Sequence, residues 1–212
     1  MDAFTSALRD HRFTDFDFDY AFRTWENQRG YPVVNVDYSS GSFRLTQERF
    51  FEQKSYGFND TSLLHSYYIP INYATQSNPN FDSTAITDYF KDTEVTKVIA
   101  ATPGSWYVFN KQQRGYYRVN YNTPNWIALR DVLNGATFSQ IHVMNRAQLI
   151  DDSFALANAG YHSDFVLAFD IMSYLKQETD FFPFYPTFRY MSNLYTVFGP
   201  SNTYLNVRQT KA

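Results

Sequence analysis

The hydrophobic positions of this 212-residue chain change their spacing near residue 122. Before that point apolar and polar residues alternate in short runs, as they do in strands whose two faces meet different surroundings. After it, apolar residues recur every three or four positions, which is the spacing of one helix face. The pattern therefore predicts a β-rich part followed by an α-helical part.

The stretch Gly115–Tyr121 stands immediately before this change. Tyr117 and Val119 fall on one side of an extended chain, and Arg118 and Asn120 fall on the other, because strand side chains alternate. A strand that runs directly into a helix fixes how the two parts meet. We expect this junction to be structural and not an active site.

Short β-rich runs precede the junction, separated by Asn, Pro, Ser and Gly. They are residues 31–38, 43–50, 67–73, 93–99, 106–110 and 116–121. The turn-forming residues Ser39–Ser42 join the first two runs, which predicts a hairpin. Roughly six or seven short strands in about 90 residues indicate a small antiparallel β-sandwich.

The first 28 residues are predicted to be the tail of another unit. Two short helical stretches are expected, Phe4–Leu8 and Tyr20–Trp25, and Asp15, Asp17 and Asp19 lie where acidic groups favour the start of the second. Neither stretch is long enough to be stable alone.

Helices are predicted from Thr123 onward. Thr123 can cap the first one, Pro124 suits its first turn, and Gly135 ends it. Asn145 and Gln148 resemble a capping box at the start of the second. The apolar stripe of the first helix is Trp126, Leu129 and Leu133. That of the second is Ala147, Ile150, Phe154 and Ala157, and the second helix is predicted to stop at Gly160.

Two further helices follow, and short loops make all of these helices antiparallel neighbours. The third starts at Ser163 and Asp164, covers residues 165–175, and is apolar nearly all round, so deep burial is expected. The fourth is predicted to end at Gly199 and Pro200. Its predicted stripe is Phe184, Phe188, Met191, Tyr195 and Phe198.

Composition narrows the classes of function. A net charge of −3 and a pI near 5.8 give no reason to expect nucleic acid or an anionic membrane surface as a partner. The absence of Cys excludes disulfides and thiolate zinc sites. Aromatic residues make up 20% of the chain, a surplus that predicts that some rings cover an interface or the place of a missing neighbour. No targeting signal and no membrane span are expected.

Candidate catalytic residues are few. None of the four histidines, His11, His65, His142 and His162, has a second His three or four residues away, so no helical zinc site is predicted. The adjacent Asp151 and Asp152 point about 100° apart on a helix and are not expected to share one site. Capping, or pairing with a basic side chain, is the expected role of these two.

The remaining motifs give little evidence of function. Arg114–Tyr121 overlaps the RNA-recognition strand pattern but lacks its small residue and its stacking aromatic, at Tyr117 and Arg118 respectively. Phosphate-binding glycine loops and the nucleophile elbow are absent from the sequence. Asn59 starts the only N-glycosylation sequon and is a possible glycosylation site.

Several stretches together resemble one enzyme family in order and spacing. They are Trp25–Val36, Thr46–Phe50, Tyr68–Ile71, Gly115–Tyr121 with Asn125 and Trp126, Arg146–Asp152, and Tyr174, Leu175 and Glu178. The series is similar to the zinc aminopeptidases of the aminopeptidase N type, and it covers nearly the whole chain. Such an ordered series is hard to obtain by chance.

The resemblance implies a place within a larger enzyme. Residues 1–28 would be the tail of a thermolysin-like catalytic domain, 29–121 a β-sandwich domain, and 122–212 the start of a C-terminal helical domain, an α-solenoid-like array truncated at Ala212. The family's zinc motif H-E-x-x-H and its loop G-x-M-E-N are absent from this sequence. The resemblance therefore implies no catalytic, metal or cofactor-binding residue here, and it implies zinc only for the full-length enzyme.

Two functions are left open by the sequence. The first is a non-catalytic C-terminal portion, a spacer and part of a helical lid, of an aminopeptidase that removes N-terminal residues from peptides. The second is a binding module or truncated paralogue that associates with a full-length aminopeptidase or another partner. The expected partner is a catalytic domain, in cis or in trans, and the resemblance implies an extracellular or plasma-membrane surface location.

Structural roles are predicted for a set of residues at and near the junction. Arg118 is expected to meet Asp151 and Asp152 across the boundary between sandwich and helices, and Trp126 and Phe154 are expected to pack in the helical core. The whole predicted junction set is Gly115, Tyr117, Arg118, Asn120, Trp126, Arg146, Asp151 and Asp152.

Overall fold

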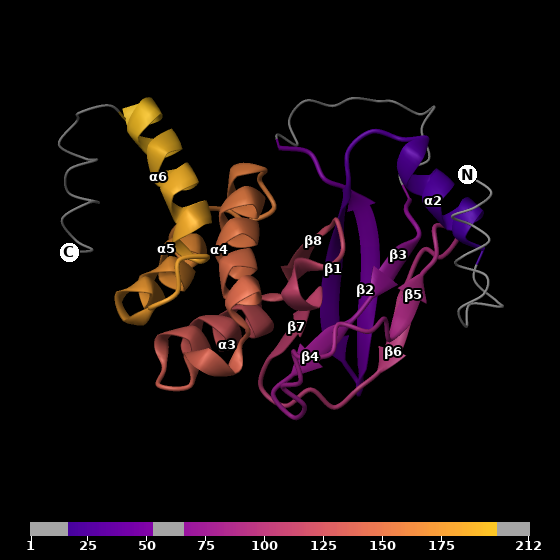
Figure 1. The fold of residues 1–212 in the computed structure, drawn as a ribbon, viewed down its shortest axis with the longest axis horizontal. Helices are drawn as coiled ribbons and strands as arrows, with labels where there is room; N and C mark the ends of the chain where they lie inside the picture. The colour runs from indigo at the N-terminus through magenta and orange to yellow at the C-terminus, as the bar shows by residue number, and fades with distance from the viewer. Residues whose placement is uncertain (1–16, 53–65, 199–212) are drawn as a thin grey trace.

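A computed structural model describes residues 17–52 and 66–198 (Figure 1). It confirms the predicted order of a β-rich part followed by helices. The helix predicted at residues 20–25 is α2, Phe18–Glu26, and the Asp17 side chain caps it by accepting from the Tyr20 N–H at 2.9 Å. The helix predicted at residues 4–8 lies outside the described residues.

The main sheet has four strands. The predicted hairpin is present as β1, Pro32–Ser39, and β2, Ser42–Arg49. The strands β6, Lys97–Ala100, and β8, Arg118–Tyr121, complete the order β6-β2-β1-β8. β8 lies parallel to β1, with Val34 opposite Val119, which the expectation of a purely antiparallel sandwich did not include.

Two smaller antiparallel sheets cover the main one. One pairs β3, Ile69–Ile71, with β5, Asp88–Phe90, and the other pairs β4, Tyr73–Thr75, with β7, Tyr107–Phe109. The run predicted as a single strand at 67–73 is therefore divided between two sheets, and β5 was not predicted. The Phe43 ring of β2 packs 5.2 Å from Tyr73 and 5.1 Å from Phe109, measured between ring centroids, which joins the two layers.

The first two long helices start one or more residues away from their predicted starts. α3, Thr123–Asn134, is capped by Asn122 and not by Thr123. α4, Val143–Asn158, is capped by the His142 ring, whose Nδ1 accepts from the Met144 N–H at 3.2 Å. The predicted capping box is therefore wrong, because Asn145 already lies inside the helix.

The last two helices differ more from expectation. α5, Val166–Met172, continues into a 3-10 segment, Ser173–Gln177, and only part of it is buried, with Val166 exposed. α6, Phe184–Phe198, buries Pro186 and Thr187 and exposes Phe188 and Tyr195 of the predicted stripe. The predicted phase of the fourth helix is wrong.

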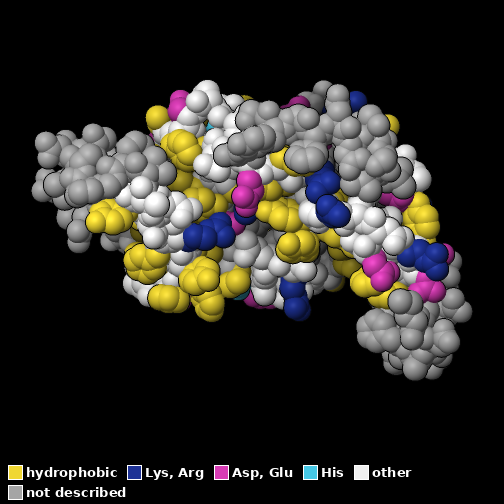
Figure 2. Space-filling model, turned by 90° about the horizontal axis from the view of Figure 1, so that it is seen from above, with side chains coloured by type: hydrophobic (Ala, Val, Ile, Leu, Met, Phe, Trp, Pro, Cys, Tyr) yellow, Lys and Arg dark blue, Asp and Glu magenta, His cyan; other side chains and the backbone are white. Residues whose placement is uncertain are grey.

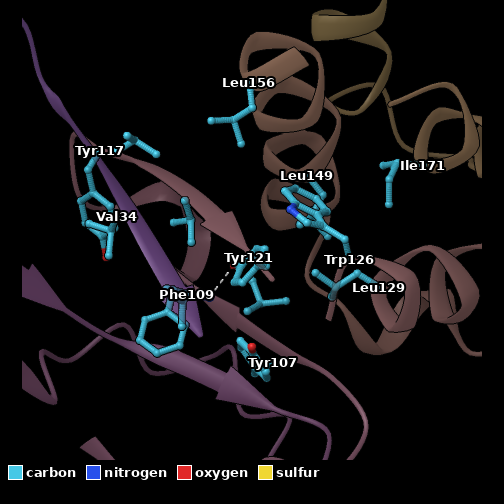
Figure 3. Close-up of a cluster of buried hydrophobic side chains, with 14 of the residues drawn as sticks. Val34, Tyr107, Phe109, Tyr117, Tyr121, Trp126, Leu129, Leu149, Leu156 and Ile171 are labelled. Atoms are coloured by element: carbon cyan, nitrogen blue, oxygen red, sulfur yellow. Dashed lines mark hydrogen bonds between the residues drawn. The ribbon is translucent and has the colours of Figure 1, made fainter. Parts of the chain in front are cut away.

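One apolar core runs through both parts of the chain. It contains Val34, Phe109 and Tyr121 from the strands together with Trp126 and Leu149 from the helices (Figure 3). The predicted packing of Trp126 and Phe154 is confirmed, since each is 1% exposed. The sheets and the first helices therefore share a core, although the chain changes architecture at residue 122.

Candidate functional site

Arg118 lies at the boundary between the sheet and the helices and contacts both. Its NH1 nitrogen donates to Asp151 Oδ2 at 2.7 Å and to Asp152 Oδ1 at 2.8 Å, both on α4. Its guanidinium carbon lies 5.0 Å from the ring centroid of Phe50 and 5.8 Å from that of Tyr31. The predicted contact between Arg118 and the two aspartates is present.

The two aspartates share this partner, contrary to the expectation from their positions on a helix. Neighbouring helical side chains leave the axis about 100° apart, yet both carboxylates reach one nitrogen of Arg118. A guanidinium lying between the two directions is accessible to each. Pairing with a basic side chain, which the sequence favoured over acid–base chemistry, is the arrangement observed.

Asp152 is the buried member of this pair, with a side chain 4% exposed. Its Oδ2 accepts from the Val119 N–H at 3.1 Å and from Gln148 Nε2 at 3.3 Å. Burial raises the pKa of Asp152 to about 6, and Arg118 opposes this rise by favouring the charged carboxylate. Asp152 thus fixes the backbone of β8 as well as its arginine.

Asp151 extends the same cluster to α6. Its Oδ1 binds Arg189 NH2, and its backbone carbonyl accepts from the Tyr190 hydroxyl at 3.1 Å. We call Arg118, Asp151, Asp152 and Arg189 the junction clamp. It ties β8, α4 and α6 together, and each of its charged groups binds another.

Arg189 was missed by the sequence reasoning. It is the only charged residue between Phe184 and Phe198, and a single charge in an otherwise uncharged, aromatic-rich helix is a signal that could have found it. Its side chain is half exposed, so its contact with Asp151 is weaker than that of Arg118.

Arg146 forms a second, more deeply buried pair, with Glu178. Arg146 Nε donates to Oε2 at 2.7 Å and NH2 donates to Oε1 at 2.9 Å, in a two-point contact. The Tyr174 hydroxyl donates to Oε2 at 3.0 Å, and the N–H groups of Thr179 and Asp180 donate to Oε1. These donors hold the pKa of Glu178 below its usual value, although burial opposes them.

The turn between β7 and β8 has an unusual backbone. Asn110, Gln112 and Gln113 all have positive φ, at 62°, 55° and 53°, which is costly for residues other than glycine. Asn145 of α4 stabilises the turn, because its Oδ1 accepts from the Gln112 N–H at 2.8 Å and its Nδ2 donates to the Asn110 carbonyl at 2.9 Å. A helical side chain therefore fixes a turn of the sandwich.

Gly115 follows this turn, and its identity is explained by Tyr117. A Cβ atom at Gly115 would lie 2.3 Å from Tyr117 Cε1, so no larger residue fits without moving the buried tyrosine. Asn110 completes the arrangement by accepting from the Gly115 N–H at 2.8 Å and donating to the Tyr117 carbonyl at 3.2 Å. Asn110 therefore ties both Gly115 and Tyr117 to the start of the turn.

Trp126 and Asn120 join the start of α3 to the sheet. Trp126 Nε1 donates to Asn120 Oδ1 at 3.1 Å, and Asn120 Nδ2 donates to Asn35 Oδ1 of β1 at 3.0 Å. Asn125 adds a pair of bonds to the backbone N–H and carbonyl of Tyr107. Buried and half-buried side-chain amides thus satisfy polar groups where the strand becomes a helix.

Two cavities flank the junction clamp, and Arg189 lines both. The first, of about 400 Å³, is mainly apolar and lies between α4 and α6, with Phe182 and Tyr185 among its walls. The second, of about 350 Å³, lies between α4, α6 and the edge of the sheet, with Phe50 and Arg118 among its walls. Their walls consist of residues that also hold the elements together.

Within residues 17–52 and 66–198, no group of three or more metal-ligating side chains is close enough to hold a metal ion. His142 caps α4, and His162 packs edge-on against Trp126 at 5.8 Å between ring centroids. His11, His65 and Asn59 lie outside the described residues. The part of the chain that the structure describes has no helix long and apolar enough to cross a membrane.

Residues 106–210 match the model of the ERAP1-like C-terminal domain family. The chain is 41% identical over 165 residues to an aminopeptidase N of Plutella xylostella, covering 75% of this chain and 17% of that relative. It is 35% identical over 173 residues to a membrane alanyl aminopeptidase of Heliothis virescens, covering 80% of this chain and 17% of that relative.

A human aminopeptidase N is also similar, at 30% identity over 194 residues, covering 88% of this chain and 19% of that protein. The chain thus spans about a sixth to a fifth of the length of the curated relatives it matches. The part that matches the family model, residues 106–210, includes β7, Arg118 on β8 and the helices that follow.

Proposed function

Because this chain belongs to the aminopeptidase N-type family, of which it forms a C-terminal portion, we propose that it supports the catalytic part of a zinc-dependent aminopeptidase without contributing catalytic groups. In this proposal the sandwich is a spacer and the helices are the beginning of a lid. The reaction is removal of N-terminal residues from peptides, and the zinc belongs to the catalytic domain.

The observation that carries the proposal is the way in which the sheet and the helices are joined. The junction clamp, the Asn145 contact with the β7–β8 turn and the shared core hold the two parts in one fixed orientation. A spacer must transmit position without bending, and buried charge pairs with several hydrogen bonds are suited to this task. Such a unit can hold a lid at a set distance from an active site.

The proposed location is the cell surface. Among the similar proteins, one is named a membrane alanyl aminopeptidase and another a thyrotropin-releasing hormone-degrading ectoenzyme of mouse, 33% identical over 171 residues. Those names describe the relatives, and we extend the location to this chain as part of the proposal.

The test is to graft the matching three quarters of this chain into the Plutella xylostella aminopeptidase, in place of the stretch that it matches over 165 residues. We expect the graft to hydrolyse an alanine chromogenic substrate at a rate within roughly threefold of the parent. A graft carrying Arg118→Met should lose most of that rate, because the lid is no longer held. A graft carrying the surface change Arg130→Met is the matched control and should keep it.

The purified chain alone, supplied with zinc and the same substrate, should give no turnover. Stoichiometric zinc binding with hydrolysis by the isolated chain would overturn the proposal. So would a folded, zinc-loaded graft whose activity is the same with Arg118 or with Met at that position.

A second candidate function is a binding module that associates with an aminopeptidase catalytic domain in trans. The exposed aromatic side chains of α6 favour it, since such patches mark interaction sites. Mixing the chain with a catalytic domain that lacks its own C-terminal portion should then restore activity. If the mixture stays inactive while the graft is active, the chain works only as a covalently joined part of the enzyme.

A further inference from the structure

The dipeptide Asn134–Gly135 lies at the end of α3 and is the only Asn-Gly pair in the sequence. The side-chain amide of an asparagine can be attacked by the backbone nitrogen of the next residue, and glycine hinders this attack least because it has no Cβ. The pair therefore has the residue types of a spontaneous deamidation site. Whether the reaction takes place depends on the conformation in which the fold holds the pair.

The Asn134 side chain connects α3 to α5. Its Nδ2 donates to the Arg130 carbonyl at 3.0 Å and to the Asp170 carbonyl at 3.1 Å, which uses both amide hydrogens. Its Oδ1 accepts from the Ser173 hydroxyl at 2.8 Å. Asp170 lies in α5, and Ser173 begins the 3-10 segment that follows it. The amide is therefore a hydrogen-bonded bridge between the two helices.

The backbone of the pair is held as well. The Gly135 N–H donates to the Val132 carbonyl at 3.2 Å. Gln177 Nε2 donates to the Leu133 carbonyl at 2.7 Å and to the Gly135 carbonyl at 3.4 Å. Attack requires the Gly135 nitrogen to eclipse Cβ of Asn134 about the Cα–C bond, whereas a helical ψ of about −42° keeps the two apart. The nitrogen therefore cannot reach the amide carbon while the end of α3 stays folded.

We propose that Asn134 is a deamidation site that the contact between α3 and α5 keeps unreactive, and that its conversion, once this contact opens, prevents the contact from closing again. The inference goes beyond the proposed aminopeptidase role, because it rests only on residues 130–177. The modification is then a one-way record of opening between these two helices.

The reaction needs only water as a co-reactant. The Gly135 nitrogen bonds to Cγ of Asn134, the Cγ–Nδ2 bond breaks, and the nitrogen's proton reaches the leaving ammonia through solvent. Water then opens the five-membered imide ring. Its attack at Cγ leaves aspartate, and its attack at the former backbone carbonyl carbon leaves isoaspartate, in which the main chain runs through the side chain.

Either product fits this place poorly. A carboxylate at position 134 has no hydrogen to donate, and it would face the carbonyl oxygens of Arg130 and Asp170 that Nδ2 now binds. It would also lie at the C-terminal end of α3, where the helix dipole disfavours negative charge. The Arg130 side chain, one turn earlier, already pairs with Asp131 and Asp170. The contact between α3 and α5 is therefore weaker in the product.

Loosening of α5 would uncover apolar side chains. Ile171 and Met172 of this helix are 0% and 5% exposed. Figure 2 shows hydrophobic side chains already gathered at the end of the molecule that carries α5 and α6. Chains modified at Asn134 should therefore bind more of a hydrophobic dye than unmodified chains do.

Incubation of the full chain in water labelled with heavy oxygen measures the reaction. After trypsin digestion in ordinary water, the peptide 131–146 contains Asn134 and Asn145, and fragmentation in a mass spectrometer locates the oxygen that hydrolysis introduced. Asn134 in the folded chain should convert at least about tenfold more slowly than in urea at the same pH, because only locally opened molecules react. Gly135→Ala should lose most of the conversion in urea, which identifies the attacking nitrogen.

Two variants in the 3-10 segment test whether the contact controls the rate. Gln177→Ala removes the donor to the Leu133 and Gly135 carbonyls, and it should raise the rate in the folded chain by about threefold or more. Lys176→Ala is the matched control, since Lys176 is exposed in the same segment, and it should leave the rate unchanged.

The variant Asn134→Asp supplies the product directly. It should speed amide exchange in α5 and raise dye binding, with exchange in β1 and β2 unchanged. Asn193→Asp makes the same change of charge at an exposed position of α6 and should have neither effect.

Four results would overturn the proposal. They are no conversion of Asn134 in urea, equal rates in the folded and the unfolded chain, equal rates in folded Gln177→Ala and Lys176→Ala, and unchanged exchange in α5 of Asn134→Asp. The comparison of folded with unfolded chain uses the unmutated protein, so it does not depend on whether any variant folds.

Discussion

Replacing Arg146 by methionine tests whether the buried pair with Glu178 holds the helices together. The change keeps the length of the side chain but leaves the Glu178 carboxylate, whose side chain is 0% exposed, with only the Tyr174 hydroxyl and two backbone N–H groups as donors. It also frees the Ile141 carbonyl, which accepts from Arg146 NH1 at 2.7 Å. Removing one partner of such a pair costs about 3–5 kcal/mol.

A double variant distinguishes the interaction between Arg146 and Glu178 from the effect of removing either charge alone. Glu178→Gln alone should cost about 2–4 kcal/mol, because Arg146 then keeps only the exposed Asp180 as an ionic partner. The double variant Arg146→Met with Glu178→Gln leaves no unpaired buried charge. It should therefore be less destabilised than the sum of the two single variants by about 2 kcal/mol or more.

The loss of stability in Arg146→Met should depend on pH, and the pKa of Glu178 fixes the direction of that dependence. The folded pKa of Glu178 is depressed, so the pair's contribution to stability is complete above the unfolded pKa near 4.5 and is lost as pH falls through the lower folded value. In Arg146→Met the same carboxyl is buried without its cation, and it should take up a proton more readily than in the unfolded chain. The deficit of this variant should therefore shrink between pH 7 and pH 4.

Urea unfolding followed by the fluorescence of the buried Trp106 and Trp126 measures these differences. Arg130→Met is the matched control, since Arg130 pairs with Asp131 and Asp170 at the surface, and it should change stability by less than about 0.5 kcal/mol. A loss below about 1 kcal/mol for Arg146→Met, or a deficit that is equal at pH 4 and pH 7, would refute the reasoning.

Three other predictions follow from the same boundary. Trp126→Ala and Phe154→Ala should each cost about 3–5 kcal/mol in urea unfolding, because both side chains are fully buried. A double-mutant cycle on Arg118→Met and Asp152→Asn should give a coupling of about 1–3 kcal/mol, since the two groups are 2.8 Å apart. Asn145→Ala should cost about 1–3 kcal/mol and speed amide exchange in the β7–β8 turn, whose N–H and carbonyl it binds.

Controls for these predictions come from the same elements. Ile127→Ala changes a neighbour of Trp126 that is partly exposed, and it should cost clearly less than Trp126→Ala. A coupling near zero in the Arg118 and Asp152 cycle would mean that the junction clamp contributes no interaction of its own. Unchanged exchange in the turn of the Asn145→Ala variant would show that the positive-φ backbone is stable without α4.

The order of elements could be predicted from the sequence because local signals agree with tertiary structure there. The Ser39–Ser42 turn between two alternating runs gave the hairpin, and Gly135 marked the end of α3. The pairing of β1 with β8 could not be predicted, since residues 40–117 separate the strands and alternation does not encode partners. Strand pairing at such distances is decided by how the layers pack.

The phase of α6 could not be predicted for a different reason. Aromatic residues occur on both the packed and the exposed face of this helix, so periodicity does not distinguish the two. Contact with α4 decides it, through Tyr190 and Phe154. Similarly, Asn145 had the spacing of a cap, but His142 ends the preceding loop closer to the first helical turn, and the asparagine instead binds the β7–β8 turn.

The parallel pairing of β1 with β8 has a consequence for synthesis of the protein on the ribosome. β1 appears early, but its second neighbour in the sheet is not made until residue 121, and the carboxylate that binds the Val119 N–H arrives only at Asp152. At translation rates of about 5–20 residues per second, β1 waits roughly 4–16 s between residue 39 and residue 121 with one edge open. Ribosome-bound chains ending between residues 39 and 121 should therefore be the ones most in need of a chaperone.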